Sequence, residues 1–494
     1  MHTHQLMQIC LGPQPHQYGP VAGRSVDKAA YRQEEVKLQE ELLKFCPADL
    51  WHDGSYSAGC PRPILLNKYH QKHLEELHEA LTIAIVDIVQ RWWTDKSARF
   101  PERMPLEAEE EELLKWIESQ VLAGNLPEFS KCLGSWRPDF LVEEDEHQTE
   151  NYRITEINAR FSFNGFMHES YGQRALNNSV EGDASELIGA TDPNMIVDGL
   201  FGLFQPDHVL HLLKGAEHGI DIHMFVDAVR RRFGINPRLV TPAELRLLSD
   251  PRSKSGYRLC CVVEHAVSPT NVWTYTTKEG EVWEEIHQIG LELHQRELSA
   301  LEPEILRQIS LRCFNDMRTI LLVHDKRMLG IIKQEIPDLV ARRVLTPMQA
   351  HVLGNGVVDT ILPGSGELQD LIQASITSPQ LRYGYILKPI RSGKGDGIVF
   401  GEDVGEDRWM SILQEHVLPK IVPGVTCVVQ RRIIPREYDL VLKGLEGRVR
   451  YPLVGTYHVA NGKLLGLGTW RASGGRIVAV SSGGSWICSV MRRD

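Results

Sequence analysis

The sequence predicts a mixed α/β protein built from several structural units. At 494 residues the chain is long enough for roughly two to four domains. Long helical repeats of apolar residues occur in the first quarter of the chain, and short β-branched and aromatic runs are common after it. Between residues 385 and 400 two such runs flank a glycine-rich loop, which we take as the most informative stretch of the sequence.

Composition excludes several classes of function. The formal charge of −11 argues against broad binding of nucleic acid or of an anionic membrane. No apolar run approaches the roughly 18 residues that a membrane-spanning helix needs. The nine cysteines include no Cys-x-x-Cys pair, which indicates reduced thiols and predicts a cytoplasmic protein.

Residues 1–130 are predicted to form a helical support, after a flexible start of about 30 residues. A helix is expected over 68–93, because apolar residues recur there at steps of three and four. A second helix is expected over 105–122, with an acidic first turn that suits the helix dipole. We interpret the acidic run Glu109–Glu112 as a solvated helix face.

Two paired strands are expected over 136–142 and 152–160. Within the second strand Glu156 and Asn158 point to the same face, because side chains alternate along a strand. Asp139 on the neighbouring strand would complete a set of oxygen ligands of the kind that Mg²⁺ prefers. The alternative is an exposed polar strand face with Asp139 in a turn.

Residues 186–310 have the pattern of a small α/β unit, which we expect to bind a substrate. Strands are predicted over 209–213, 238–241 and 259–263 and a helix over 220–233, where Gly234 is a suitable stop. The stripe Val282, Ile286, Ile289 and Leu293 predicts a further helix over 282–298.

A strand is expected over 319–323, followed by a helix that Asp325 caps and Lys326 opens. A lysine at a helix start opposes the helix dipole unless an anion lies nearby. This local conflict is typical of a functional position.

The stretch 385–400 reads as a strand ending in Lys388, a loop with three alternating glycines, and a second strand. Such a loop can present backbone N–H groups to a polyphosphate, and Lys388 and Lys394 add positive charge. It is neither a Walker A loop nor a Rossmann fingerprint, since no Gly-Lys-Ser/Thr occurs and a strand follows the glycines. A plain surface hairpin is the alternative. Further on, a strand is expected over 427–432, and Asn461-Gly462 predicts a hairpin that ends at Arg471.

Taken together, these pieces resemble the circularly permuted ATP-grasp family, which includes eukaryotic glutathione synthetase and the synthetase domain of glutathionylspermidine synthetase. The resemblance rests on Arg137-Pro138-Asp139, Glu156-Ile157-Asn158, Asp325-Lys326, the Lys388 glycine loop and the strand ending at Arg471. In the usual ATP-grasp order the Glu-x-Asn motif lies near the C-terminus, whereas here it precedes Lys388. The resemblance therefore implies metal-binding strands in 131–185 and a nucleotide-binding region with a glycine-rich lid in 311–494, on either side of the 186–310 unit.

The resemblance also implies roles for individual residues. Asp139, Glu156 and Asn158 would hold Mg²⁺, and Arg137 and Arg471 would face the transferring phosphoryl group. Lys326 and Lys388 would contact the phosphates of ATP. The lid residues over the phosphates would be Ser392, Gly393, Lys394, Gly395 and Gly397, with Gln430 and Arg431 at the adenine hinge. Arg160 would contact phosphate or a carboxylate substrate, or else form a structural ion pair.

The activity that the resemblance implies is an ATP-dependent ligase that joins a small-molecule carboxylate, perhaps of an amino acid, to an amine. A small-molecule kinase and a non-catalytic ATP-binding relative are the alternatives, and an interaction protein whose glycine loops are only turns is a third. Neither substrate is implied, since no glutathione-binding feature or amidase domain can be transferred. Small molecules, and by family analogy a second copy of the chain, are the expected partners.

Overall fold

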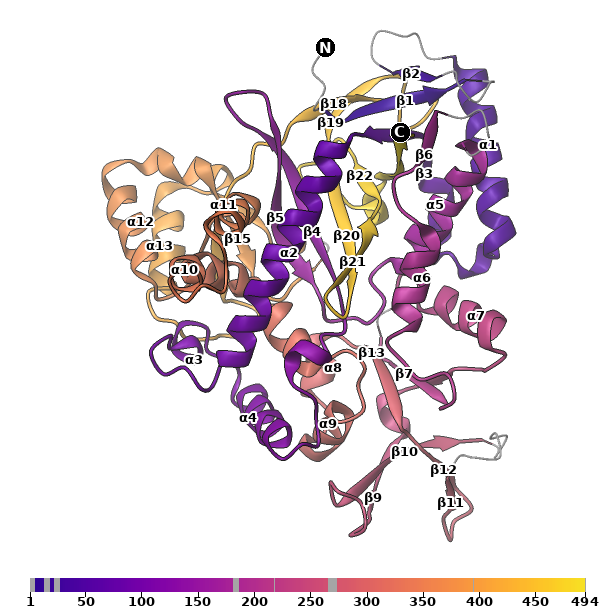
Figure 1. Cartoon of the computed structure of the whole chain (residues 1–494). Coiled ribbons are helices and arrows are strands. Elements are labelled where there is room, and N and C mark those ends of the chain that lie inside the picture. The colour runs from indigo at the N-terminus through magenta and orange to yellow at the C-terminus, as the bar shows by residue number, and fades with distance from the viewer. Residues whose placement is uncertain are drawn as a thin grey trace.

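The computed structural model describes residues 5–12, 18–21, 27–180, 186–216, 218–264, 273–393 and 395–493. The core of the fold is a ten-stranded sheet with the order β2-β1-β3-β23-β22-β20-β4-β5, to which β21 and β6 add at β20 and β23 (Figure 1). Its strands are β1 (Met7–Leu11), β2 (Tyr18–Pro20), β3 (Gly59–Leu66), β4 (Ser135–Glu144), β5 (Glu150–Asn158), β6 (Leu187–Gly189), β20 (Val454–Ala460), β21 (Lys463–Leu467), β22 (Trp470–Ala472) and β23 (Ser485–Arg492). Strands from both ends of the chain therefore share one sheet.

Helix α2 (Lys68–Arg91) packs on one face of this sheet, as its apolar stripe predicts (Figure 1). Leu77 and Leu81 are fully buried, and the His78 ring meets the Tyr457 ring of β20 edge-on at 5.8 Å. Since side chains alternate along a strand, Thr456 and His458 must point to the opposite face. That opposite face carries the polar side chains described below, and α5 (Phe166–Val180) packs over its β23 end.

The N-terminal region is not only helical, which corrects the expectation for 1–130. Of the start that was expected to be flexible, residues 5–12 and 18–21 are described and contain β1 and β2, and the other residues before 27 lie outside the described residues. It supplies α1 (Lys28–Phe45), α2, α3 (Phe100–Arg103) and α4 (Ala108–Leu122), but also the sheet strands β1, β2 and β3. Strand β3 pairs in parallel with β23, and seven of its eight residues are buried. The sequence signal was weak because a strand buried on both faces shows no alternation of apolar and polar residues.

Residues between 187 and 310 form two small sheets and several helices. A parallel sheet has the order β13-β7-β8, and an antiparallel sheet has the order β11-β12-β10-β9. The strands are β7 (Leu210–Lys214), β8 (Arg238–Val240), β9 (Leu245–Ser249), β10 (Tyr257–Val263), β11 (Thr274–Thr276), β12 (Val282–Glu285) and β13 (Gln288–Glu292), with helices α6 (Pro193–Phe201), α7 (Ile222–Phe233), α8 (Gln295–Ser299) and α9 (Pro303–Ser310). The helix expected over 220–233 is confirmed as α7, which Gly234 ends at a φ of 68°.

The helix expected over 282–298 is wrong. The chain forms β12, β13 and the short α8 there. All five residues of β13 are buried, because this strand lies beside β7 in the parallel sheet. A strand that is buried on both faces places apolar residues at every position, so spacings of three and four arise without a helix.

A second lobe holds the four-stranded sheet β14-β17-β15-β16, with helices around it, on the left of Figure 1. Its elements are β14 (Thr360–Ile361), β15 (Tyr385–Pro389), β16 (Val399–Phe400), β17 (Cys427–Arg431), α10 (Arg327–Ala341), α11 (Pro347–Gly356), α12 (Gly366–Thr377) and α13 (Glu406–Glu415). The predicted strand pair around the glycine loop is confirmed as antiparallel β15 and β16. A separate ribbon pairs β18 (Glu437–Leu440) with β19 (Val449–Pro452).

The strand expected over 319–323 is also wrong, since Thr319–Val323 forms a π-helical turn that leads towards α10. All five residues are buried, so the short apolar run carried no periodicity that separates a strand from a helix. No helix among the described residues is long and apolar enough to cross a membrane.

Gly330 in α10 provides a test of how this lobe is packed. A Cβ at Gly330 would lie 2.7 Å from the Thr360 carbonyl oxygen and 2.5 Å from a Leu362 methyl group. We predict that Gly330→Ala lowers the free energy of unfolding by about 1–3 kcal/mol, because the backbone at Thr360 must move to make room for the new methyl group. Gly366→Ala in α12 is the control, since its Cβ would meet nothing within 4 Å. Equal melting temperatures for the two variants would contradict this packing.

Candidate functional site

The pairing of β4 with β5 places four polar side chains on one face of the large sheet. Asp139 lies directly opposite Glu156, and Arg137 lies directly opposite Asn158, with a bulge after Asp139. Opposite residues of an antiparallel pair share a face, so the sequence-predicted ligands lie together. The expected strand pair is confirmed, and the alternative of Asp139 in a turn is wrong.

Cations surround both carboxylates of this group. Asp139 accepts from Arg137 Nε at 3.0 Å and from Arg471 Nη2 at 2.6 Å. Glu156 Oε2 lies 3.4 Å from Lys326 Nζ and 3.9 Å from Lys388 Nζ. Four cations therefore meet two carboxylates, with Arg137 on β4 itself and Arg471, Lys326 and Lys388 from other elements.

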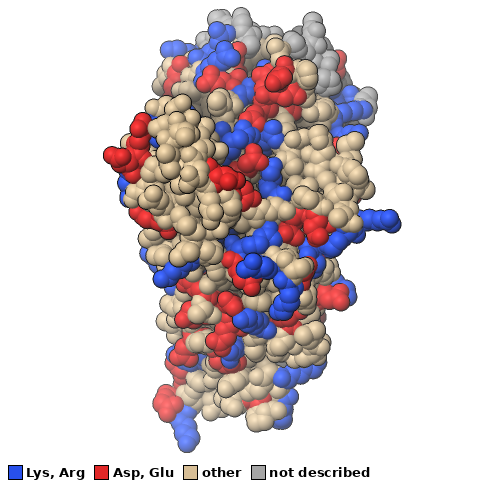
Figure 2. All heavy atoms as spheres, turned by 90° about the vertical axis from the view of Figure 1, so that its left-hand side faces the viewer, with Lys and Arg blue, Asp and Glu red and all other residues tan. Residues whose placement is uncertain are grey.

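Burial makes this charge arrangement costly and shifts the pKa values. Both lysine side chains are about 95% buried, from exposures of 5% and 6%. Burial raises the pKa of Glu156, but Lys326, Lys388, Arg471 and Arg137 outweigh it and hold that pKa well below its usual range. Burial also lowers the pKa of Lys388 to about 8, although Glu156 opposes the shift. Figure 2 shows a band of mixed basic and acidic side chains between largely uncharged surfaces on the side of the α12–α13 lobe.

Lys388 and Gln430 meet at one backbone carbonyl of β5. The Thr155 oxygen accepts from Lys388 Nζ at 3.1 Å and from Gln430 Nε2 at 3.3 Å. The other amide atom of Gln430, Oε1, is buried and accepts no hydrogen bond among the described residues. Arg431 differs, because its guanidinium pairs with Glu143 through bonds of 2.7 and 2.9 Å. The structure therefore brings Gln430 to the site and directs the Arg431 side chain to Glu143.

The glycine-rich loop joins β15 to β16 and touches Lys326. The Ser392 carbonyl accepts a hydrogen bond from Lys326 Nζ. Gly395 and Gly397 adopt φ values of 77° and 72°, which favour glycine. A Cβ at Gly395 would lie 2.4 Å from Ile477, so a second loop packs against this one. Gly393 follows Ser392, and a Cβ there would meet nothing within 4 Å, whereas Lys394 lies outside the described residues.

Arg160 follows the Glu-x-Asn motif and is 9% exposed. It donates to the Arg391 carbonyl at 2.9 Å, and its Nε has no hydrogen-bond partner among the described residues. Burial and the nearby Arg391 lower the pKa of Arg160 to about 10. No carboxylate within this part of the chain forms an ion pair with it, so the structure favours a ligand-binding role over a structural ion pair.

The oxygen atoms of Asp139, Glu156 and Asn158 are chemically suited to Mg²⁺, which prefers carboxylate and amide oxygens. Asn158 Nδ2 is buried without a hydrogen-bond partner in the described residues, so no internal bond there fixes the amide. A second cluster of possible ligands, His211, Cys261 and Glu284, lies buried between the two small sheets. There Arg238 donates to both oxygens of Glu284, which already balances that carboxylate.

Two residues that contact the site were not predicted from the sequence, Arg391 and Glu110. Glu110 was placed on a solvated helix face, but it is 6% exposed and its carboxylate accepts from the Arg391 guanidinium at 2.7 and 2.6 Å. The sequence offered one usable signal, namely that Arg391 lies within the lysine–glycine stretch itself.

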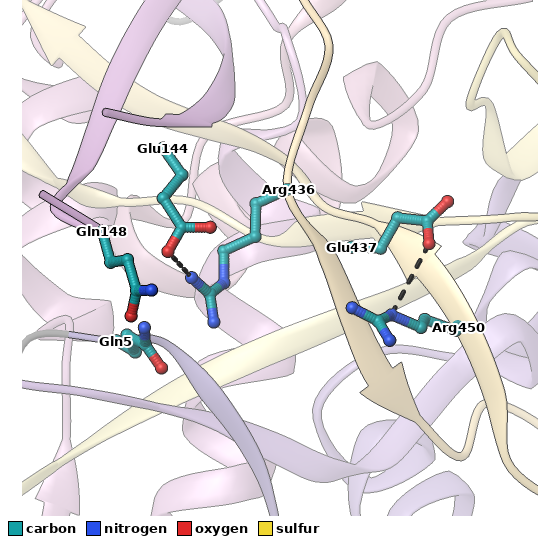
Figure 3. A pocket seen from close by; sticks show the side chains of 6 residues that line it. All are labelled: Gln5, Glu144, Gln148, Arg436, Glu437 and Arg450. Carbon is teal, nitrogen blue, oxygen red and sulfur yellow. Dashed lines mark hydrogen bonds and ion pairs between the residues drawn. The ribbon is translucent and has the colours of Figure 1, made fainter. Parts of the chain in front are cut away.

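A pocket of about 440 Å³ lies apart from this site, at the tip of the β4–β5 hairpin (Figure 3). Arg436 pairs there with Glu144, and Arg450 Nε lies 3.6 Å from Glu437. Gln5 and Gln148 complete the lining. Because the charges cancel in pairs and no predicted site residue lines it, this pocket is not the candidate site.

Comparison with known proteins finds similarity both in sequence and in overall structure. The sequence model of the family described as the AnkG N-terminal domain matches residues 77–322 of this chain. The ATP-grasp enzyme ankG of Aspergillus thermomutatus is 35% identical over 441 residues, which cover 88% of each chain. The solved structure of a glutathione synthetase-like effector, GSS30, from Globodera pallida in the apo form aligns with a TM-score of 0.53 and 11% identity, over 97% of this chain and 98% of that one.

The structural likeness at 11% identity concerns the fold alone, and it agrees with the expected mixed α/β fold of the glutathione synthetase type. The sequence likeness extends over most of both chains. The chain therefore belongs to the family of ATP-grasp enzymes that includes ankG.

Proposed function

We propose that the protein is an ATP- and Mg²⁺-dependent ligase that activates a small-molecule carboxylate as an acyl phosphate and joins it to an amine. The observation that carries the proposal is a largely buried group of four cations, Arg137, Arg471, Lys326 and Lys388, around the two carboxylates Asp139 and Glu156. A polyphosphate would compensate this charge, since buried cations are costly unless they are paired.

The proposed reaction has two steps. A carboxylate oxygen of the first substrate attacks the γ-phosphorus of ATP, and the bond to the β–γ bridging oxygen breaks to release ADP. The amine nitrogen then attacks the acyl carbon, inorganic phosphate leaves, and one proton is lost to give the amide. Phosphoryl transfer needs mainly positioning and charge stabilisation, which lysines and arginines supply without a covalent nucleophile.

Each residue has a role in this scheme. Lys326 and Lys388 bind the phosphates, and Arg137 and Arg471 stabilise the charge that develops on the transferring group. Asp139, Glu156 and Asn158 would hold Mg²⁺, which neutralises phosphate charge when it is bound. Arg160, a buried cation with no ion-pair partner in the described chain, suits the carboxylate of the substrate or its acyl phosphate.

The glycine-rich loop would act as the lid. Excluding water protects an acyl phosphate from hydrolysis, so a cover over the phosphates serves the second step. Lys326 Nζ donates a hydrogen bond to the Ser392 carbonyl. This contact links the loop to the phosphate-binding lysine, so the two would move together. The order of the motifs along the chain supports a circularly permuted ATP-grasp arrangement, with residues 186–310 as the substrate-binding insertion. We expect the enzyme to be cytoplasmic and, by analogy with the family, dimeric.

The decisive experiment measures ADP release with panels of carboxylates and amines, together with the mass of the product. An amide product with stoichiometric ADP and phosphate supports the ligase. A stable phosphorylated product without amide would replace the ligase with a kinase. Mg-ATP binding without turnover across the panels would favour a binding module.

We predict that Glu156→Gln reduces Mg²⁺-dependent turnover by about 100-fold or more, because charge stabilisation by a bound metal amounts to several kcal/mol. Glu144→Gln is the matched control, since this carboxylate of neighbouring β4 pairs with Arg436 away from the site. Initial rates of ADP formation test the difference. Wild-type rates in Glu156→Gln would remove this residue from the metal site.

We also predict that ATP affinity falls as the pH rises through about 8. Burial lowers the pKa of Lys388 to about 8, and the phosphate-binding form of the lysine is the protonated one that predominates below this value. Calorimetry near pH 8, in buffers of different ionisation enthalpy, should therefore detect proton uptake when ATP binds. Lys388→Arg should abolish the uptake, because a guanidinium stays protonated. Equal proton uptake in the variant and the wild type would show that another group titrates.

A further inference from the structure

Arg391 lies at the base of the glycine-rich loop, where three carboxylates from two other elements converge on its guanidinium. Glu110 of α4 accepts two hydrogen bonds, at 2.7 and 2.6 Å. Glu107, which precedes α4, lies 3.2 Å from Nη1, and Asp325, which precedes α10, lies 3.2 Å from Nε. The Arg391 side chain is 11% exposed and that of Glu110 8%, so this pair is shielded from solvent.

The backbone around Arg391 is bonded to residues of the candidate site at three successive carbonyls. The amide of Lys326 donates to the Ile390 oxygen at 3.0 Å, and Lys326 Nζ donates to the Ser392 oxygen. Arg160 donates to the Arg391 oxygen between them. A shift of Arg391 would therefore move Lys326, Arg160 and the start of the loop together.

The acidic side of the cluster is itself held in place. Glu107 and Glu110 form the capping box of α4, in which the Glu107 amide donates to Glu110 Oε2 at 3.2 Å. Asp325 accepts from Arg327 Nε and Nη2 at 2.9 and 2.8 Å, and Arg327 Nη1 reaches the Pro105 carbonyl at 2.7 Å. The carboxylates that hold Arg391 are therefore all tied to the N-terminal part of α4. Glu107 and Glu110 belong to it, and Asp325 is linked to the segment before it through Arg327 and the Pro105 carbonyl.

We infer that Arg391 is a positioning residue for the phosphates of ATP, and that through Glu110 the N-terminal helical region forms part of the nucleotide site. The inference rests on the proposed function. A buried guanidinium shared by several carboxylates has one defined geometry, and replacing the Glu110 carboxylate weakens the two shortest contacts that fix it, those at 2.7 and 2.6 Å. The loop base and Lys326 would then lose their fixed position relative to Glu156.

The test compares Glu110→Gln with Glu109→Gln, its exposed neighbour on the same helix. Binding of Mg-ATP is measured by calorimetry, and binding of adenosine, which lacks phosphates, by competition against Mg-ATP. We expect Glu110→Gln to weaken Mg-ATP binding about tenfold and leave adenosine binding unchanged, with Glu109→Gln equal to the wild type. Hydrogen exchange of peptides ending at Gly393 should become faster in Glu110→Gln without any nucleotide. Arg391→Lys keeps the charge but cannot bind three carboxylates at once, so it should give an intermediate loss of Mg-ATP affinity. This variant replaces Glu110→Gln in the test if Glu110→Gln fails to fold.

Two results would overturn the inference. Mg-ATP affinity of Glu110→Gln within twofold of the wild type would show that the cluster does not position the phosphates. Equal weakening for adenosine and Mg-ATP would show a general structural loss instead. If the wild type itself fails to bind Mg-ATP, the proposed function and the role of Arg391 towards phosphates are both wrong. The hydrogen-exchange experiment still decides in that case whether Glu110 holds the loop in place.

Discussion

The pairing of Asp139 with Glu156 across two antiparallel strands is the constraint on which the candidate site depends. The register fixes the two carboxylates side by side, and four cations contact them, one from β4 itself and three from other elements. Each of these carboxylates has two cationic side chains as partners. A nucleotide with its metal would exchange these partners, since phosphates could take the cations while the carboxylates turn to the metal.

This arrangement explains why the site draws on so many elements. The carboxylates belong to the large sheet, Lys388 to the sheet of the second lobe, and Lys326 to the start of α10. Thr155 joins the two sheets, because its carbonyl accepts hydrogen bonds from Lys388 and Gln430. The candidate site is therefore an interface between lobes, where a change in their relative position would alter the distances between charges from the two sides.

The sequence predicted the strands of the site better than the elements around it. Strands β4, β5, β15 and β17 were predicted correctly because charged and amide residues stand out within their apolar pattern. The loop between β15 and β16 was predicted because glycine is concentrated there. Residues 319–323 and 282–298 were misassigned because buried apolar segments carry no periodicity that separates strand from helix. Glu110 was missed for a different reason. Its burial depends on an arginine 281 residues away, which no local pattern encodes.

The parallel pairing of β3 with β23 has a consequence for how the protein is made. Strand β3 is synthesised early, yet its neighbour spans Ser485–Arg492, and Trp486 pairs with Gly59 across most of the chain. Contacts of such long sequence separation form slowly, since the intervening chain must first be ordered or closed as a loop. On the ribosome, β3 must wait for almost the whole chain before its hydrogen bonds are satisfied on that side. Its apolar face and open edge would meanwhile favour assistance by chaperones over unaided folding.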